Sequence, residues 1–167
     1  MKDIYLLIGG NMGDRVASMK EAVEQIGKRC GQILHQSGLY ETAAWGNTDQ
    51  PDFLNQAIQI QTGSGPHDLL KTILSIEKNM GRFRNIPLGP RIIDIDIVFF
   101  GDRIISDAGL DVPHPRMSQR RFVLVPLNEI APDFIHPVLK ITVRELLKNC
   151  DDPLPVNKYE PIVNNKQ

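Results

Sequence analysis

Ile92-Ile93-Asp94-Ile95-Asp96-Ile97-Val98-Phe99-Phe100 is the stretch of sequence that decides the fold. Its side chains alternate between apolar and acidic, and successive side chains of a strand point to opposite faces, so the pattern predicts a strand. The residues expected to pack on helices from one face are Ile93, Ile95, Ile97 and Phe99. Asp94 and Asp96 are expected on the other face, with Cα atoms roughly 7 Å apart.

The sequence before this strand predicts the order β-α-β-β-α-β. The expected elements are a strand over 4–8 ending at Gly9-Gly10, a helix after Asp14, strands over 32–41 and 53–62, a helix from Pro66 to Gly81, and the strand over 92–100. This order is typical of a ferredoxin-like α+β fold, an antiparallel sheet with both helices on one face. The other face is then left for later segments of the chain.

The last third of the chain supplies those segments. Residues 122–130 are expected to be helical despite Pro126, and Thr142 with Glu145 has the spacing of a capping box. We expect one domain over residues 1–150 and an irregular C-terminal extension over 151–167, which contains several prolines.

The composition excludes several classes of protein. The formal net charge of −1 provides no basic field for nucleic acid, and two distant cysteines indicate neither a zinc site nor a disulfide framework. The apolar run over 4–8 is far too short for a signal peptide or a membrane span. We therefore expect a cytoplasmic protein that binds neither nucleic acid nor membranes, and a monomer.

The Asp94 and Asp96 pair has two interpretations. Ionised carboxylates at this spacing repel by about 2 to 3 kcal/mol at an effective dielectric constant near 20, and aspartate is disfavoured in strands. A magnesium ion would relieve the repulsion, because it prefers one or two carboxylates together with waters and phosphates. A solvated outer face of the sheet would relieve it equally well, and the spacing alone leaves both interpretations open.

Arginines near the pair favour phosphate chemistry. Arg82, Arg84 and Arg91 lie in a loop rich in glycine and proline, next to the carboxylates. Metal-binding carboxylates and arginines that contact phosphate oxygens are what phosphoryl transfer requires. The sequence has no GxxxxGK[ST] loop, no GxGxxG and no protein-kinase signature, so no standard nucleotide motif supports this prediction.

Further candidates lie on both sides of the loop. Phe53 and Asn55 are two residues apart on an expected strand, so one face presents a ring and an amide that would suit a flat heterocycle. Core packing of Phe53 and an ordinary surface position for Asn55 remain open at this point. His114 lies between two prolines, and Arg120 follows it.

Taken together, these pieces resemble one family. The matching segments are Ile8-Gly-Gly-Asn11, Tyr40-Glu-Thr42, Gln50-Pro-Asp-Phe-Leu-Asn55, Ile76-Glu77, Gly81-Arg-Phe-Arg84, Gly89-Pro-Arg-Ile-Ile-Asp-Ile-Asp96 and Val112-Pro-His-Pro-Arg116 to Phe122. The sequence is similar to the 6-hydroxymethyl-7,8-dihydropterin pyrophosphokinases of folate biosynthesis. The resemblance covers about residues 4 to 135 and implies the same ferredoxin-like fold.

The resemblance also implies a reaction and a set of roles. The pterin hydroxymethyl oxygen would attack the β-phosphorus of ATP and release AMP, with two Mg²⁺ ions held by Asp94 and Asp96. The implied transition-state residues are Arg82 and Arg91. The implied ATP contacts are Glu77, Arg84, His114 and Arg120, and the implied pterin contacts are Thr42, Trp45, Phe53, Asn55 and Phe122.

Some positions depart from the family pattern. Leu88 replaces a frequent aromatic residue, Ala43 and Ala44 replace frequent prolines, and Gly10 replaces a frequent serine. These changes concern substrate affinity and loop closure. Two other functions stay open from the residues alone: another magnesium-dependent phosphoryl or nucleotidyl transferase, and a non-catalytic ferredoxin-like binding module.

Overall fold

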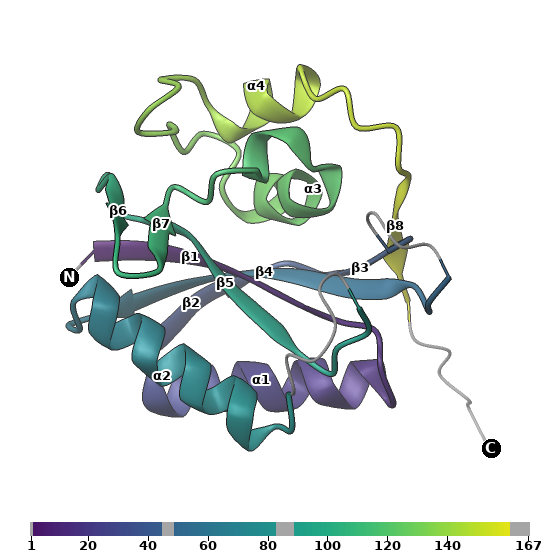
Figure 1. The fold of residues 1–167 in the computed structure, drawn as a ribbon. Coiled ribbons are helices and arrows are strands. Elements are labelled where there is room, and N and C mark those ends of the chain that lie inside the picture. The colour runs from purple at the N-terminus through teal and green to yellow at the C-terminus, as the bar shows by residue number, and fades with distance from the viewer. Residues whose placement is uncertain (1, 45–48, 83–88, 161–167) are drawn as a thin grey trace.

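The chain folds around one antiparallel sheet (Figure 1). A computed structural model describes residues 2–44, 49–82 and 89–160. The strands of this sheet are β1 (Lys2–Gly10), β2 (Gln32–Gln36), β3 (Leu39–Thr42), β4 (Phe53–Thr62), β5 (Asp94–Phe100) and β8 (Val156–Tyr159). They follow the order β5-β1-β4-β3-β8, and β2 also pairs with β4. Every pair is antiparallel.

Helices cover both faces of the sheet. Helices α1 (Arg15–Arg29) and α2 (Pro66–Asn79) lie on one face, and α3 (Arg121–Ile130) and α4 (Val143–Lys148) lie on the other (Figure 1). A hairpin of β6 (Ile105–Asp107) and β7 (Leu110–Val112) and the short 3-10 helix η1 (Met117–Gln119) connect β5 to α3. The predicted ferredoxin-like α+β fold is confirmed.

Local sequence signals account for the helix starts. The Asp14 carboxylate accepts a hydrogen bond from the Ala17 N–H, and Pro66 occupies the first turn of α2, as predicted. The predicted capping box is confirmed in its first half, because the Thr142 hydroxyl accepts from the Glu145 N–H at 3.2 Å, while the Glu145 carboxylate accepts from that hydroxyl at 3.1 Å.

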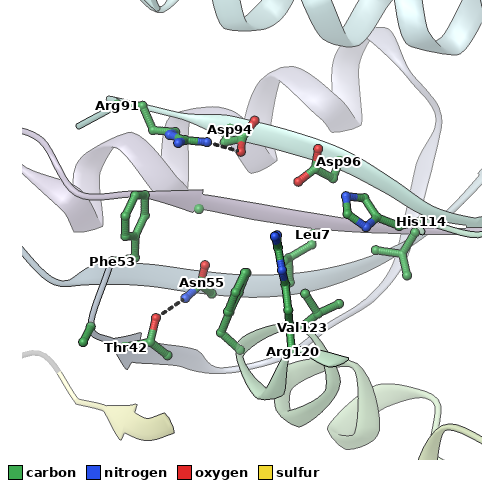
Figure 2. A pocket seen from close by; sticks show the side chains of 14 residues that line it. Leu7, Thr42, Phe53, Asn55, Arg91, Asp94, Asp96, His114, Arg120 and Val123 are labelled. Atoms are coloured by element: carbon green, nitrogen blue, oxygen red, sulfur yellow. Dashed lines mark hydrogen bonds and ion pairs between the residues drawn. The ribbon is translucent and has the colours of Figure 1, made fainter. Parts of the chain in front are cut away.

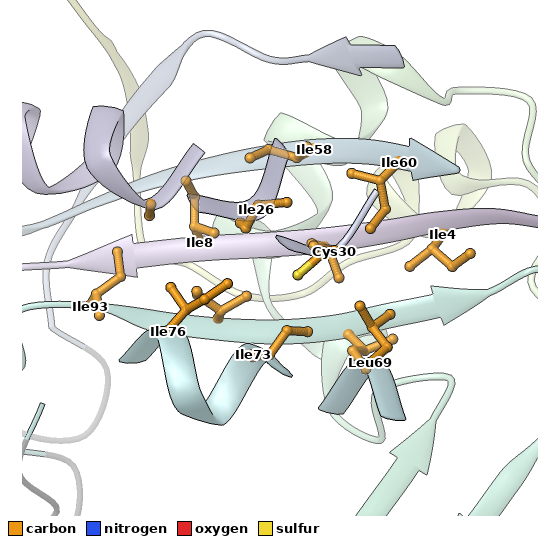
Figure 3. Close-up of a cluster of buried hydrophobic side chains, with 14 of the residues drawn as sticks. Ile4, Ile8, Ile26, Cys30, Ile58, Ile60, Leu69, Ile73, Ile76 and Ile93 are labelled. Atoms are coloured by element: carbon orange, nitrogen blue, oxygen red, sulfur yellow. The ribbon is translucent and has the colours of Figure 1, made fainter. Parts of the chain in front are cut away.

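Two apolar layers stabilise the sheet. The larger layer joins the sheet to α1 and α2 and includes Ile4, Ile8, Ile26, Ile73 and Ile76 (Figure 3). The second joins the opposite face to α3 and α4. The isoleucines predicted to face the helices, Ile93, Ile95 and Ile97, lie in the larger layer.

Phe99 is on the face opposite to the predicted one. The pairing of β1 with β5 shifts between Tyr5 and Leu6, so that Tyr5 pairs with Phe99 and Leu6 with Ile97. This bulge leaves Val98 unmatched and reverses the alternation after it. Val98 and Phe99 therefore both belong to the α3 and α4 layer, where the Phe99 ring packs against Phe134 at 4.5 Å between centroids.

Two other predictions need correction. The strand expected over 32–41 is divided into β2 and β3, both of which pair with β4. The extension after residue 150 is not irregular throughout, since Val156–Tyr159 forms β8 on the edge of β3. Asp152 also holds this segment to α3 by accepting from the Arg121 N–H at 3.0 Å. The division of the chain at residue 150 stays a prediction.

Among the residues that the structure describes, no helix is long and apolar enough to cross a membrane.

Candidate active site

A cavity opens on the α3 face of the sheet, where β1, β3, β4 and β5 lie side by side (Figure 2). The predicted site residues that line it are Thr42, Phe53, Asn55, Arg91, Asp94, Asp96, His114, Arg120 and Phe122. Segments far apart in the sequence therefore meet in one place. The aspartates lie in a concave site on this face of the sheet.

The pairing of β4, β1 and β5 brings three residues side by side at the centre of this cavity. Asn55 of β4 pairs with Gly9 of β1, and Gly9 pairs with Asp94 of β5. Directly paired residues of antiparallel strands point to the same face, so the Asn55 amide and the Asp94 carboxylate face the cavity with Gly9 between them. The Asn55 Nδ2 donates to Thr42 Oγ1 at 3.1 Å, and this bond orients the amide (Figure 2).

Gly9 is a site residue that the sequence analysis did not identify. A Cβ atom at this position would lie 2.7 Å from Asn55 Oδ1 and 3.3 Å from the Leu54 carbonyl oxygen. Any larger residue would displace the amide and fill the space between Asn55 and Asp94. The signal in the sequence was the pair of glycines at the end of an apolar strand.

Arginines cover both oxygens of Asp94. Arg82 donates to Oδ1 at 2.5 Å and Arg91 donates to Oδ2 at 2.9 Å. Burial lowers the pKa of Arg82, but Asp94 and Glu77 raise it by more, so its pKa lies above the ordinary value. The guanidinium groups thus balance negative charge at the start of β5.

Glu77 lies behind the aspartates. It is 3% exposed, accepts from the Ile95 N–H at 3.0 Å, and forms an ion pair with Arg82. Burial raises its pKa, partly offset by the Ile95 hydrogen bond and by Arg82. Glu77 does not line the cavity described above, so in this structure it anchors β5 and Arg82.

Asp96 is the unusual carboxylate of the pair. Burial and the nearby charges of Asp94 and Glu77 raise its pKa from 3.8 to about 7. Arg82 and Arg91 form hydrogen bonds with Asp94 and act on Asp96 through their charge. This carboxyl is costly to ionise here, and a bound cation would favour its ionised form.

The donor set fits magnesium. Within residues 2–44, 49–82 and 89–160, no group of three or more His, Cys, Asp or Glu side chains is arranged as a complete metal site. Two carboxylates on one strand face leave coordination positions for waters and substrate phosphates, as magnesium requires.

A second cavity adjoins the first. Its walls include Leu70, Leu110 and Pro115, and it shares Asp96 and His114 with the first cavity. Burial, and then the neighbouring Arg120, lower the pKa of His114. Its Nδ1 accepts from the Arg116 N–H at 3.3 Å, which leaves Nε2 as the protonated nitrogen of a neutral ring.

The two aromatic residues of the first cavity each contact an arginine. The Arg91 guanidinium lies 5.6 Å from the Phe53 ring centre, and that of Arg120 lies 5.7 Å from the Phe122 ring centre. Phe53 and Asn55 share one face of β4, as predicted. The predicted contacts Trp45 and Arg84, and the departure at Leu88, lie outside the described residues.

Asn11 joins the loops around the site and was missed by the sequence analysis. It is 2% exposed, and its Nδ2 donates to Gln50 Oε1 and to the Pro51 carbonyl oxygen, both at 2.9 Å. Its Oδ1 accepts from the Arg91 N–H at 2.9 Å. One buried amide therefore connects the segment before Phe53 to the arginine loop.

Comparisons with known proteins identify the family of the chain. The model of the family 7,8-dihydro-6-hydroxymethylpterin-pyrophosphokinase (HPPK) matches residues 5–132. The chain is 44% identical to a 2-amino-4-hydroxy-6-hydroxymethyldihydropteridine pyrophosphokinase of Methylorubrum extorquens, over 96% of this chain and 100% of the relative. It is 42% identical to the folic acid synthesis protein FOL1 of Dictyostelium discoideum, over 95% of this chain but only 24% of that protein.

A solved structure supports the fold. The HPPK-DHPS protein of Plasmodium falciparum superimposes with a TM-score of 0.69 at 21% identity, over 89% of this chain and 43% of that one. The chain thus spans less than half of this structure and about a quarter of the Dictyostelium protein, but all of the Methylorubrum relative.

Proposed function

The chain belongs to the 7,8-dihydro-6-hydroxymethylpterin-pyrophosphokinase family, and from this premise we propose the reaction that its site performs. It is a diphosphotransferase of folate biosynthesis, which transfers diphosphate from ATP to the hydroxymethyl group of 6-hydroxymethyl-7,8-dihydropterin. The pterin oxygen forms a bond to the β-phosphorus, the bond from that phosphorus to the AMP oxygen breaks, and the hydroxyl proton is released. The comparisons support this reaction and neither of the alternative functions.

One observation carries the proposal. A single cavity contains a carboxylate pair, two phenylalanine rings and an orienting amide. Another phosphoryl transferase would use the carboxylates but would not need an aromatic pocket beside them, and a binding module would need no paired aspartates. Transfer of a diphosphate group to the hydroxymethyl group of a flat heterocycle uses both parts.

Asp94 and Asp96 are proposed to hold two Mg²⁺ ions. When bound, magnesium lowers the pKa of a coordinated hydroxyl and neutralises phosphate charge. Asp96 must be ionised to take part, and its pKa of about 7 makes that ionisation sensitive to the presence of a cation. The proposed metal ions would therefore lie beside Gly9, which pairs with Asp94.

Arg82 and Arg91 are proposed to leave Asp94 and contact phosphate oxygens in the transition state. Both are already within hydrogen-bond distance of the carboxylate that the metal would take over. An arginine that leaves Asp94 can then bind phosphate, because a guanidinium can donate to two phosphate oxygens at once.

Phe53, Phe122, Asn55 and Thr42 are proposed to bind the pterin. The rings would stack on its faces, and the amide would hydrogen-bond its polar edge. His114 and Arg120 are proposed to contact ATP, whose nucleoside would occupy the second cavity beside Asp96. Glu77 would act on ATP through Arg82. Trp45 is still proposed to contact the pterin, and Arg84 to contact ATP. A cytoplasmic monomer remains our prediction.

The nucleotide product tests the function. We expect the chain, mixed with ATP, magnesium and the reduced pterin alcohol, to release AMP and no ADP. Chromatography of the nucleotides separates the outcomes, since ADP would indicate a different kinase and the absence of turnover a binding module. Asp96→Ala is expected to abolish AMP release and keep the fold, whereas near-normal activity would exclude the metal assignment.

A further inference from the structure

Glu129 joins the far end of helix α3 to strand β3. Its Oε1 accepts from the Tyr40 hydroxyl at 2.5 Å, and its Oε2 accepts from the Gly38 N–H at 2.8 Å. The Lys158 Nζ of β8 lies 3.9 Å from Oε1. One carboxylate thus connects α3 to β3 and to β8, and its residue lines neither cavity described above.

Tyr40 and Glu129 each lie close in the fold to residues of the first cavity, which contains the Phe53 and Phe122 rings. Tyr40 is the cross-strand partner of Asn55, and it is two residues from Thr42, so all three side chains share the face that α3 covers. On α3, Glu129 lies seven residues after Phe122, which places both on one side of the helix. The hydrogen bond between Tyr40 and Glu129 therefore joins that side of α3 to β3.

We propose that Glu129 and Tyr40 are positioning residues. They hold the Phe122 ring, which forms one wall of the pterin pocket, at the correct separation from Phe53 and Asn55 on the opposite wall. The inference rests on the proposed role of Phe122 in pterin binding. It adds a determinant of ring affinity that touches neither substrate and lies on the side of the pocket away from the metal pair.

The chemistry of the pair suits a permanent link. A phenol that donates to a carboxylate makes a charge-assisted hydrogen bond, which is stronger than one between neutral groups. Burial, and then the bond to Glu129, raise the pKa of Tyr40 to about 12, so the hydroxyl keeps its proton at physiological pH. The Glu129 side chain is 33% exposed, so we expect the link to act mainly on geometry and little on overall stability.

The test separates binding of the ring from binding of the nucleotide. In Tyr40→Phe we expect the dissociation constant for the pterin alcohol to rise about tenfold, and that for a non-hydrolysable ATP analogue with magnesium to change less than twofold. Glu129→Ala should match Tyr40→Phe, and Glu129→Gln, which keeps one acceptor oxygen, should fall between Glu129→Ala and the unchanged chain. Tyr159→Phe removes a phenol from the neighbouring strand and should alter neither constant.

Two outcomes would overturn the inference. One is unchanged pterin affinity in Tyr40→Phe, and the other is an equal loss of pterin and nucleotide affinity, which would indicate general disruption of the fold. Phe122→Ala keeps the proposed function separate. If that variant binds the pterin normally, the wall assignment is wrong, whereas weak binding by Phe122→Ala with normal binding by Tyr40→Phe contradicts only the positioning role.

Discussion

Arg82 donates a hydrogen bond to Asp94 across 2.5 Å, and Arg91 donates to the other oxygen of the same carboxylate across 2.9 Å. Two guanidinium groups therefore bind the carboxylate that is proposed to bind magnesium. Under the proposed function, magnesium and arginine would compete for Asp94, and binding of the metal would leave an arginine available for phosphate. Arg82, Arg91 and the proposed metal site would then be linked through one side chain.

Removal of Arg82 should strengthen metal binding to the substrate-free chain. In Arg82→Gln we expect Mn²⁺ to bind about fivefold more tightly, equivalent to roughly 1 kcal/mol, because Asp94 loses one competing cation. Calorimetry at pH 8.5 keeps the carboxylates ionised. Arg103→Gln, which removes an arginine next to the Phe100 ring, serves as the control. Unchanged or weaker binding in Arg82→Gln would refute the competition.

Asp96 should make the metal-free chain less stable as the pH rises. Its pKa is about 7 in the folded chain and 3.8 ordinarily, so the folded state binds more protons than the unfolded state between these values. The free energy of unfolding must then fall from about pH 4 to pH 7. Urea unfolding at pH 5 and pH 8 should show this loss, and Asp96→Asn should reduce it. A variant with the same pH dependence as the unchanged chain would rule out Asp96 as its source.

The sequence predicts the elements of this fold better than their exact pairing. Alternation of side chains located β5 and the aspartate face, but Phe99 was placed wrongly because a bulge opposite Tyr5 and Leu6 depends on the partner strand. The strand β8 was missed for a similar reason. Val156–Tyr159 has no strong strand pattern of its own and is held by the free edge of β3.

The same distinction applies to the site. Residue type and strand periodicity marked Asp94, Phe53 and Asn55 as candidates and left other interpretations open, and the family resemblance then implied their roles. Neither residue type nor periodicity marked Asn11 or Gly9, because their importance comes from contacts with residues about 40 to 80 positions away in the chain. Periodicity predicts which way a side chain points, whereas contacts between loops depend on the assembled sheet.

Gly9→Ala should weaken pterin binding selectively. The added Cβ would lie 2.7 Å from Asn55 Oδ1, so the amide must move and its bond to Thr42 must change. We expect the dissociation constant for the pterin alcohol to rise at least about tenfold, or 1.4 kcal/mol, with nucleotide affinity nearly constant. Gly63→Ala is a matched control, because a Cβ there meets no atom within 4 Å. Equal pterin affinity in both variants would contradict the role of Gly9 as the small residue that leaves room for the Asn55 amide.

Location of the metal ions tests the central claim most directly. The measurement is anomalous diffraction from crystals of the chain grown with Mn²⁺, a non-hydrolysable ATP analogue and the pterin alcohol. We predict two manganese ions beside β5, each with an oxygen of Asp94 or Asp96 at about 2.0 to 2.2 Å, and one of them in contact with the pterin hydroxyl. Manganese bound only by the nucleotide, with neither carboxylate within coordination distance, would contradict the account.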